Sequence, residues 1–236
     1  MKILALDSSG IVASVAVVED DTLLAEYTVN YKKTHSQTLL PMLDEIVKMT
    51  ELELESVDAI AVAAGPGSFT GLRIGSATAK GLGLALKKPL VAVPTVDALA
   101  YNLYDAQGLI CPIMDARRNQ VYTGLYRFDE AGNLVTEMDQ IPMDVNELID
   151  LLLEKDEEVQ FTGDGIQVYG SQILSKMKHA RLAPAHLNKQ KAGSVAYAGA
   201  YRYAHEQYIN GDDFAPEYLR MSQAERERKE KGERNE

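Results

Sequence analysis

The stretch "AVAAGPGSFTGLRIGSATAKGLGLALKKP", residues 61–89, decides how this chain of 236 residues folds. A largely apolar run at 57–64 leads into a glycine-rich turn, and the turn leads into a segment at 71–86 with few bulky side chains. The run predicts a buried strand and the segment predicts a helix. The helix is the unusual element, because a helix with few large side chains must pack against something that comes very close.

Small residues recur at every fourth position of this predicted helix. The line consists of Gly71, Gly75, Ala79 and Gly83, and beside it lie Ser76, Ala77, Gly81 and Ala85. Each glycine inside a helix costs about 0.8–1.0 kcal/mol relative to alanine, so a close contact has to compensate for the loss. A flat line of this kind permits close approach of another backbone. The residues alone leave two partners open, the chain's own sheet and a helix of a second protein.

The turn before the helix lies where a strand becomes a helix, and unpaired N–H groups at such a place attract anions. Its sequence, "GPGSFTGLR", lacks the Gly-Lys-Ser/Thr ending of a P-loop and the third glycine of the dinucleotide motif. A tight turn with glycines at positive φ and Thr70 as the helix N-cap is the favoured interpretation. The weaker interpretation is a nucleotide or phosphate site, and its residues are Asp7, Ser8, Ser9, Gly65 and Gly67.

The chain on either side of this stretch follows one plan twice. Three β-type runs at 2–6, 12–18 and 22–29 precede an amphipathic helix, and "LICPIMDARRNQVYTGLYRF", from residue 109, opens a second meander. Asp7 and Asp115 end the first strand of each unit. The pattern predicts an α/β protein with the actin-like ATPase (ASKHA, ribonuclease-H-like) fold and two lobes, each of βββαβα type.

The predicted parts follow from this plan and from the charge distribution. They are an N-terminal ribonuclease-H-like lobe at 1–106, a smaller C-terminal lobe at 107–192, a helix and extension at 193–220 that packs back between the lobes, and a tail at 221–236. The last dozen residues, "ERERKEKGERNE", contain no apolar side chain and cannot join a core. The tail is therefore expected to be a solvated, charged end.

Composition narrows the classes of function. With a formal net charge of −11, the chain has no general basic surface for binding nucleic acid, so we expect it to act on RNA only with a basic partner. The longest internal apolar run, 59–64, is far shorter than the roughly 18 residues that span a bilayer. The N-terminus shows no secretory signal, and the single cysteine, Cys111, fits a reducing compartment. We expect a cytoplasmic protein without a membrane segment.

The sequence lacks the motifs that would indicate a helical metal site or a serine hydrolase. The four histidines include no pair spaced by three or four residues, so a helical metal pair cannot form and no metal is expected. No Gly-x-Ser-x-Gly motif of a serine hydrolase is present. Asp7, Asp115 and the turn Gly163-Asp164-Gly165 keep open an alternative, an independent ATP-dependent phosphotransferase or peptidase of actin-like fold.

Several stretches together resemble the TsaB (YeaZ) family. They are "ILALDSSG", "HSQTLLPMLDEIV", "AVAAGPGSFTGLRIGSATAKGLGLAL", "PLVAVPTVDALA", "MDARRNQVYTGLY" and "PEYLR", and the resemblance spans residues 1–220. It implies a non-catalytic paralogue of TsaD, which works with TsaD and the ATPase TsaE to transfer a threonylcarbamoyl group to the adenosine next to the tRNA anticodon. No catalytic residue and no cofactor of its own is implied, although a nucleotide at the interface with TsaD is possible.

The resemblance also implies how the chain differs from TsaD and where it binds. Thr95 and Leu99 stand where TsaD has its metal-binding His-x-x-x-His pair, so the older glycoprotease-like label does not fit. The family's partner surface maps onto residues 36–49 and 71–86. The same surface would form a homodimer when the chain is alone, and tRNA would be reached only through the complex. The predicted interface residues are Leu39, Met42, Leu43, Ile46, Gly71, Leu72, Gly75, Ser76, Ala79 and Gly83.

Overall fold

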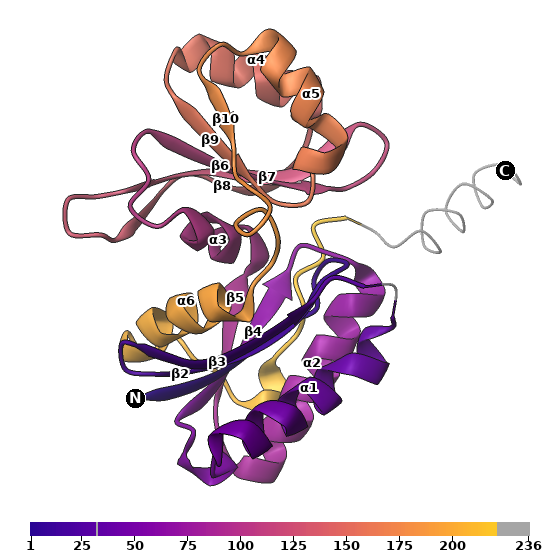
Figure 1. Ribbon diagram of the computed structural model, residues 1–236, viewed down its shortest axis with the longest axis vertical. Coiled ribbons are helices and arrows are strands. Elements are labelled where there is room, and N and C mark those ends of the chain that lie inside the picture. Colours follow the sequence, from indigo (N-terminus) through magenta and orange to yellow (C-terminus); the bar gives the residue numbers. More distant parts are fainter. Residues whose placement is uncertain (32, 221–236) are drawn as a thin grey trace, which may run out of the picture.

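The computed structural model describes residues 1–31 and 33–220, and these fold into two lobes, each built on a five-stranded sheet (Figure 1). The predicted charged tail at 221–236 lies outside the described residues. The predicted fold class, an α/β protein of the actin-like ATPase type with two lobes, is confirmed. None of the helices in the described part of the chain is long and apolar enough to cross a bilayer.

The first sheet has the order β3-β2-β1-β4-β5, in which β1 pairs antiparallel with β2 and parallel with β4. Its strands are β1 (Lys2–Asp7), β2 (Ala13–Glu19), β3 (Thr22–Val29), β4 (Ala59–Gly65) and β5 (Leu90–Pro94). Helices α1 (His35–Thr50) and α2 (Phe69–Leu86) cover one face. Helix α6 (Ala192–Ala204) covers the other face, which points toward the second lobe (Figure 1).

The second sheet repeats the plan with the order β10-β9-β6-β7-β8. Its strands are β6 (Leu109–Asp115), β7 (Gln120–Phe128), β8 (Leu134–Asp144), β9 (Val159–Thr162) and β10 (Ala180–Leu182). Helices α4 (Val145–Lys155) and α5 (Ile166–Lys176) cover one face. Helix α3 (Thr95–Ala100) packs on the other. The 3₁₀ turns are η1 (Leu54–Ser56), η2 (Tyr101–Leu103) and η3 (Gly211–Asp213).

Burial explains the strand sequences. Every residue of β4 is buried because the strand lies inside the sheet and both faces carry helices. Its alternate residues accordingly divide between two cores: Ile60 and Val62 face α1 and α2, whereas Ala61 and Ala63 face α6. The residues that face α6 are small, so this helix can approach the sheet closely.

Two boundaries differ from the sequence expectation. Strand β10 was not expected, since a three-residue strand carries almost no periodic signal. The last helix was expected at about 194–209 but ends at Ala204. Residue Ile209 is instead paired with Leu90 at the edge of β5, through two backbone hydrogen bonds of 2.9 Å. A tertiary contact therefore ends the helix before its apolar pattern does.

Candidate functional site

The ten predicted interface residues lie inside the N-terminal lobe. All are buried, and the apolar ones of α1, together with Ala79, belong to the core between the two helices and the first sheet. Within the single chain these positions are covered by its own residues, so their part in an interface with another protein stays a prediction. The residues concerned are Leu39, Met42, Leu43, Ile46, Gly71, Leu72, Gly75, Ser76, Ala79 and Gly83.

The glycines of α2 allow the helix to pass over the loop after β1. A Cβ atom at Gly71 would lie 2.1 Å from the carbonyl oxygen of Ser8, and one at Gly75 would lie 2.5 Å from the Ser8 hydroxyl. That hydroxyl donates a hydrogen bond of 2.8 Å to the Gly71 carbonyl. Of the two partners that the sequence left open for this line of small residues, the structure selects the chain's own loop and sheet.

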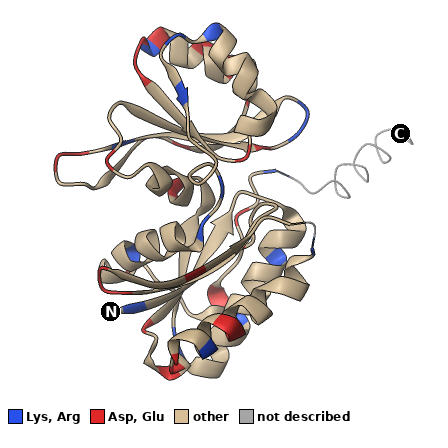
Figure 2. Ribbon diagram, in the orientation of Figure 1, with Lys and Arg blue, Asp and Glu red and all other residues tan. Residues whose placement is uncertain are grey.

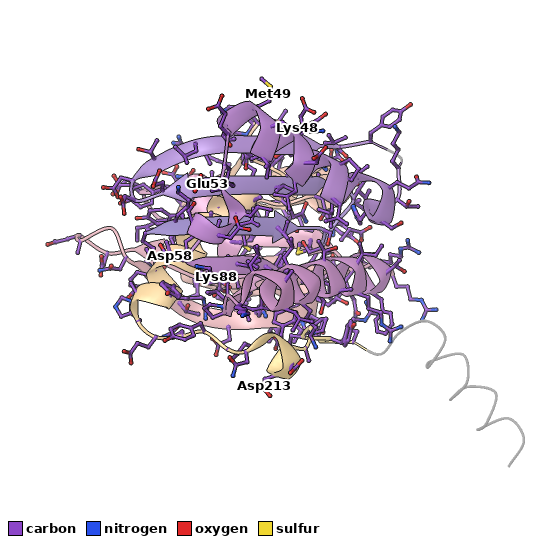
Figure 3. The ribbon with its side chains drawn as sticks, turned by 90° about the horizontal axis from the view of Figure 1, so that it is seen from below. Lys48, Met49, Glu53, Asp58, Lys88 and Asp213 are labelled. Atoms are coloured by element: carbon purple, nitrogen blue, oxygen red, sulfur yellow. The ribbon has the colours of Figure 1, made fainter. Side chains whose placement is uncertain are left out.

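A different set of residues faces outward from the two helices. Leu84 is 81% exposed, and a Cβ atom at Gly81 would meet no atom within 4 Å. At the end of α1, Lys48 and Met49 project away from the protein (Figure 3). We use the name outer stripe for a set of exposed residues on the outward faces of α1 and α2. It consists of Leu40 on α1 and of Arg73, Ala77, Gly81, Leu84 and Ala85 on α2.

The second candidate site is the cleft between the lobes, a cavity of about 530 Å³. The turn at Gly67–Thr70 lines one side, and the turns that carry Asp115 and Asp164 line the other. Residues 217–220 also line the cleft, and we call them the C-terminal strap. This arrangement combines carboxylates, hydroxyls and two arginines around one polar opening.

Asp7, at the end of β1, is buried beside this cleft. One of its carboxylate oxygens accepts hydrogen bonds from the backbone N–H of Ser9 at 2.8 Å and from the Ser9 hydroxyl at 2.7 Å. Burial raises the pKa of Asp7 to about 6, although the two bonds from Ser9 oppose the shift, and the charge of Asp164 across the cleft raises it further. Asp7 thus titrates close to neutral pH.

The predicted phosphate residues are brought together, but the chain's own backbone fills the space around them. A Cβ atom at Gly65 would lie 2.2 Å from the Glu217 carbonyl oxygen, and one at Gly67 would lie 2.3 Å from the carbonyl oxygen of Ser9. The N–H of Ser68 donates to that same Ser9 carbonyl at 2.6 Å. The N-cap of α2 is Ser68, which accepts from the N–H of Gly71, and not Thr70 as the sequence suggested.

The C-terminal strap is the end of the extension predicted at 193–220, and it joins the two lobes. The N–H of Glu217 donates to the Ala64 carbonyl at 2.7 Å in the first lobe, while Arg220 donates to the Ala116 carbonyl at 2.7 Å in the second. Between them, the ring of Tyr218 packs on Phe69 with centroids 4.4 Å apart. An apolar Phe-Ala-Pro stretch before the strap was the available signal for an ordered segment.

At the other positions considered in the sequence, the structure shows buried packing residues. Thr95 and Leu99, where the resemblance places the chelating histidines of TsaD, are fully or almost fully buried in α3. Among residues 1–31 and 33–220, no group of three or more His, Cys, Asp or Glu side chains is placed to hold a metal ion. The thiol of Cys111 is buried, which raises its pKa to about 12, so it is a packing residue.

Comparisons with known proteins assign the chain to a family. A family model described as TsaD, tRNA N6-adenosine threonylcarbamoyltransferase, matches residues 22–228. The protein from Bacillus subtilis called tRNA threonylcarbamoyladenosine biosynthesis protein TsaB is 34% identical over 230 residues, which cover 95% of this chain and 96% of the relative. The Escherichia coli protein of the same name is 36% identical over 134 residues, 56% of this chain and 58% of the relative.

Solved structures agree with the sequence matches. A crystal structure described as an uncharacterized protein with similarity to peptidase YEAZ from Pseudomonas aeruginosa superposes with a TM-score of 0.78 at 26% identity, and covers 93% of this chain and 99% of its own. A structure named YeaZ from the same organism gives a TM-score of 0.76 at 25% identity, covering 92% and 99% of the two chains. Component A of (R)-2-hydroxyglutaryl-CoA dehydratase from Acidaminococcus fermentans has a TM-score of 0.51 at 11% identity over 87% of this chain and 98% of its own, and therefore shares the fold alone. On the strength of the full-length match to TsaB, this chain belongs to the TsaB (YeaZ) family of tRNA threonylcarbamoyladenosine biosynthesis proteins.

Proposed function

We propose that this chain is a non-catalytic subunit that binds and activates TsaD, and that it acts with TsaE in transferring a threonylcarbamoyl group to the adenosine next to the tRNA anticodon. The observation that carries the proposal is family membership, combined with an outward helical surface that has little bulk at its centre. A reaction on tRNA would place the chain in the cytoplasm, with tRNA reached through the complex.

The outer stripe supports helix docking by TsaD. Arg73, Ala77, Gly81 and Ala85 repeat at every fourth position, so they form one exposed line along α2. A methyl or hydrogen side chain at three of these positions permits close approach of a partner helix, and the exposed Leu84 supplies an apolar anchor. This line is adjacent to the buried one that the sequence suggested, displaced around the same helix.

The same surface would support a homodimer when the chain is alone. Because each copy would bury the outer stripe in a homodimer, association of two copies and association with TsaD would compete. The net charge of −11 gives two copies the same sign of charge, so the homodimer should strengthen as salt screens their repulsion.

A co-purification experiment with cognate TsaD tests the proposal. Ala77→Arg places a long charged side chain at the centre of the outer stripe without touching the core, since Ala77 is exposed. We expect this variant to lose co-elution with TsaD and at least about tenfold of the tRNA modification rate, because an interface centre tolerates an unpaired charge poorly. The matched control Ser171→Arg, on the exposed side of α5, should retain both.

Full co-elution and full modification by Ala77→Arg would contradict the proposed docking surface. Loss of the modification with both variants would instead indicate a general defect, which the melting temperatures of the two proteins detect. Modification of tRNA by TsaD and TsaE at the full rate without this chain would refute the activating role itself.

One observation favours a second candidate, an ATP-dependent enzyme of actin-like fold. Asp7 has a strongly raised pKa beside the cleft, as catalytic carboxylates often do. Against it, Glu217 and Ser9 pack on the two glycines that a phosphate would approach. Calorimetry with ATP and Mg²⁺ on the isolated chain separates the two functions, since saturable heat with turnover supports the enzyme and its absence supports the subunit.

A further inference from the structure

A second surface feature lies on the opposite face of the first sheet from α1 and α2, and we call it the aromatic notch. It is a cavity of about 430 Å³ lined by Tyr101, Tyr104, Gly193, Ser194 and Tyr197. Two of the tyrosines come from η2 and the residue after it, where the chain leaves the first lobe, and the third comes from α6, which returns to it. The notch is distinct from both the outer stripe and the cleft.

Four aromatic rings contact one another around the notch in a closed cycle. Tyr101 contacts Phe128 and Tyr197 at centroid distances of 5.7 and 5.3 Å, and Tyr104 contacts the same two rings at 5.0 and 6.0 Å. Phe128 belongs to β7, so the second lobe holds the rings from behind. Tyr104 remains 53% exposed and Tyr197 48% exposed. The rings are therefore fixed in position while much of their surface stays open to a ligand.

Tyr101 and Tyr197 remain uncharged at neutral pH. Burial raises the pKa of Tyr101 to about 12, and burial together with the neighbouring Tyr104 raises the pKa of Tyr197. A neutral aromatic ring presents a partially negative face, which attracts a cation within about 6 Å of its centroid. The exposed ring surfaces thus favour a positively charged group over a neutral or negative one.

Carboxylates near the notch add to this preference. Glu26 on β3 accepts a hydrogen bond of 2.8 Å from the N–H of Gly193, which lines the cavity. The negative charge of Asp21 is close enough to raise the pKa of Tyr197. Figure 2 shows acidic residues at the β2–β3 and β7–β8 turns, on the side of the molecule where α6 and α3 lie. An anion, including a nucleic-acid phosphate, would be repelled from this region.

The positive charge of Arg202 does not offset the negative charge near the notch. Arg202 on α6 is paired with Asp97 at 3.0 Å, and the Asp97 carboxylate also accepts a hydrogen bond from the Tyr126 hydroxyl at 2.8 Å. Aromatic faces rimmed by surplus negative charge are the environment in which guanidinium and ammonium groups bind proteins.

We propose that the aromatic notch binds a cationic side chain, arginine or lysine, presented by a partner protein. The aliphatic stem of that side chain would pack on the rings while its charged head lies among the carboxylates of Asp21 and Glu26. Because Tyr101, Tyr197 and Phe128 join both lobes, such a partner would contact the chain at the junction of its two halves. This surface leaves the outer stripe free, so it would serve a different partner contact from the one proposed for TsaD.

Nuclear magnetic resonance of the full chain with ring-labelled tyrosine tests the proposal directly. The probe is N-acetyl-arginine-methylamide, and the uncharged aliphatic control is N-acetyl-norleucine-methylamide. We expect the arginine probe to shift the resonances of Tyr104 and Tyr197 in a saturable way, with an affinity about threefold or more above that of the norleucine probe, as exposed cation–π contacts allow. No TsaD is needed, so failure here is distinguishable from failure of the proposed function.

Three variants make the outcome specific to the rings. Tyr197→Leu keeps an apolar side chain but removes the ring, and should abolish the difference between the two probes, whereas Tyr197→Phe should retain it. The control Tyr208→Leu removes another half-exposed tyrosine, one that stacks on Tyr203 away from the notch, and should change nothing. Equal affinities for the two probes, or an unchanged preference for arginine in Tyr197→Leu, would overturn the proposal.

Discussion

Two turns of this molecule occupy equivalent places in the two lobes and have very different surroundings. The turn at 65–68 joins β4 to α2, and the turn at 163–165 joins β9 to α5; each lies beside the aspartate that ends the first strand of its lobe. In the first lobe that aspartate, Asp7, is 1% exposed. In the second lobe Asp115 is exposed and accepts a hydrogen bond of 3.1 Å from the hydroxyl of Tyr169.

The difference teaches that duplication of a topology does not duplicate an environment. The first turn is covered by Ser9 and by Glu217 of the C-terminal strap, which packs on it from the far end of the chain. The helices differ as well, since Gly71 of α2 approaches a backbone carbonyl whereas Gly170 of α5 meets the side chains of Leu182 and Ile166. The difference in tightness thus lies in the helices, because the turn of the second lobe also meets backbone: a Cβ atom at Gly163 would lie 2.2 Å from the Ile113 carbonyl oxygen.

The largest expected effect comes from replacing one buried glycine in each helix, Gly71 of α2 and Gly170 of α5, with alanine. Gly71→Ala should destabilise the protein by about 3 kcal/mol, because a Cβ atom at 2.1 Å from the Ser8 carbonyl forces backbone to move. Gly170→Ala should change the free energy of unfolding by less than about 1 kcal/mol, because the Leu182 methyl can rotate away and alanine is the better helix former. Urea denaturation of both variants measures the two values.

Similar losses in the two variants would show that the lobes are equally tight and would remove the contrast. If Gly71→Ala fails to accumulate as a folded protein, the measurement can be made on the unfolding rate of Gly75→Ala. There the clash is with the Ser8 hydroxyl, a side-chain atom that can rotate, so a milder effect of the same sign is expected.

The pH dependence of folding stability gives a second test of the difference between the two lobes. Burial raises the pKa of Asp7 to about 6 from an ordinary value near 4, so the folded protein binds this proton more tightly than the unfolded chain does. The stability that this group contributes is fully present below about pH 4 and is lost as the pH rises through 6. Asp7→Asn keeps an oxygen that can accept the bonds from Ser9, so it should be more stable than the wild type by about 2 kcal/mol above pH 7, with the gain vanishing near pH 4.

Asp115→Asn provides the matched control, because Asp115 ends the first strand of the second lobe but is exposed. This change should not reproduce the gain in stability expected of Asp7→Asn above pH 7. An Asp7→Asn variant less stable than the wild type at every pH would mean that the ionised carboxylate is stabilising, contrary to the assignment of burial as the dominant cause.

The sequence predicted the fold well because local patterns specify it. Meanders, glycine turns and apolar runs are read within windows of about ten residues, so the order of strands and helices and the place of Asp7 and Asp115 could be foreseen. Which face of α2 is buried could not. The line through Gly71 and the line through Ala77 both consist mainly of small residues, and the contacts that Gly71 and Gly75 make with Ser8 show which of them faces inward.

Burial of the cleft residues was beyond local patterns for the same reason. Gly65, in the turn after β4, is covered by Glu217 of a strap that lies far away in the sequence, and such a contact leaves no periodic trace. Ala77, Gly81 and Ala85 were noted beside the predicted line but were not among the predicted interface residues, because periodicity indicates that a helix has two faces without indicating which one meets the sheet when both carry small residues. The candidate site therefore lay on the predicted helices but on the neighbouring line of residues.

Removing the strap should make the first turn resemble the second. A chain ending at Ala215 loses the bond from Glu217 to the Ala64 carbonyl, the Tyr218–Phe69 ring contact and the bond from Arg220 to the second lobe. We expect a loss of about 1–2 kcal/mol in the free energy of unfolding and faster hydrogen exchange at 64–70, as one ring contact and two partly exposed hydrogen bonds would give.

The control for this truncation is a chain ending at Arg220, which keeps the strap and removes only residues 221–236. It should match the full-length protein in both measurements. Equal exchange rates in the chains ending at Ala215 and Arg220 would show that the strap contributes nothing to the closure of the first turn, and the difference between the two turns would then need another cause.

The smallest expected effect has the opposite sign and tests the two lines of α2 against each other. Gly81 is exposed, and a methyl group there would meet no atom within 4 Å, so Gly81→Ala should stabilise the folded chain by about 0.8–1.0 kcal/mol through helix propensity alone. Gly81 also lies in the outer stripe, where a methyl group is small enough for a partner helix to tolerate. Thermal melting should therefore show the gain while co-elution with TsaD is kept, and the larger Gly81→Leu should retain most of the thermal gain but weaken association with TsaD. Close contact with a partner would explain why a glycine, which lowers helix stability, occupies this exposed position. If Gly81→Leu binds TsaD as well as the wild type does, that explanation is wrong.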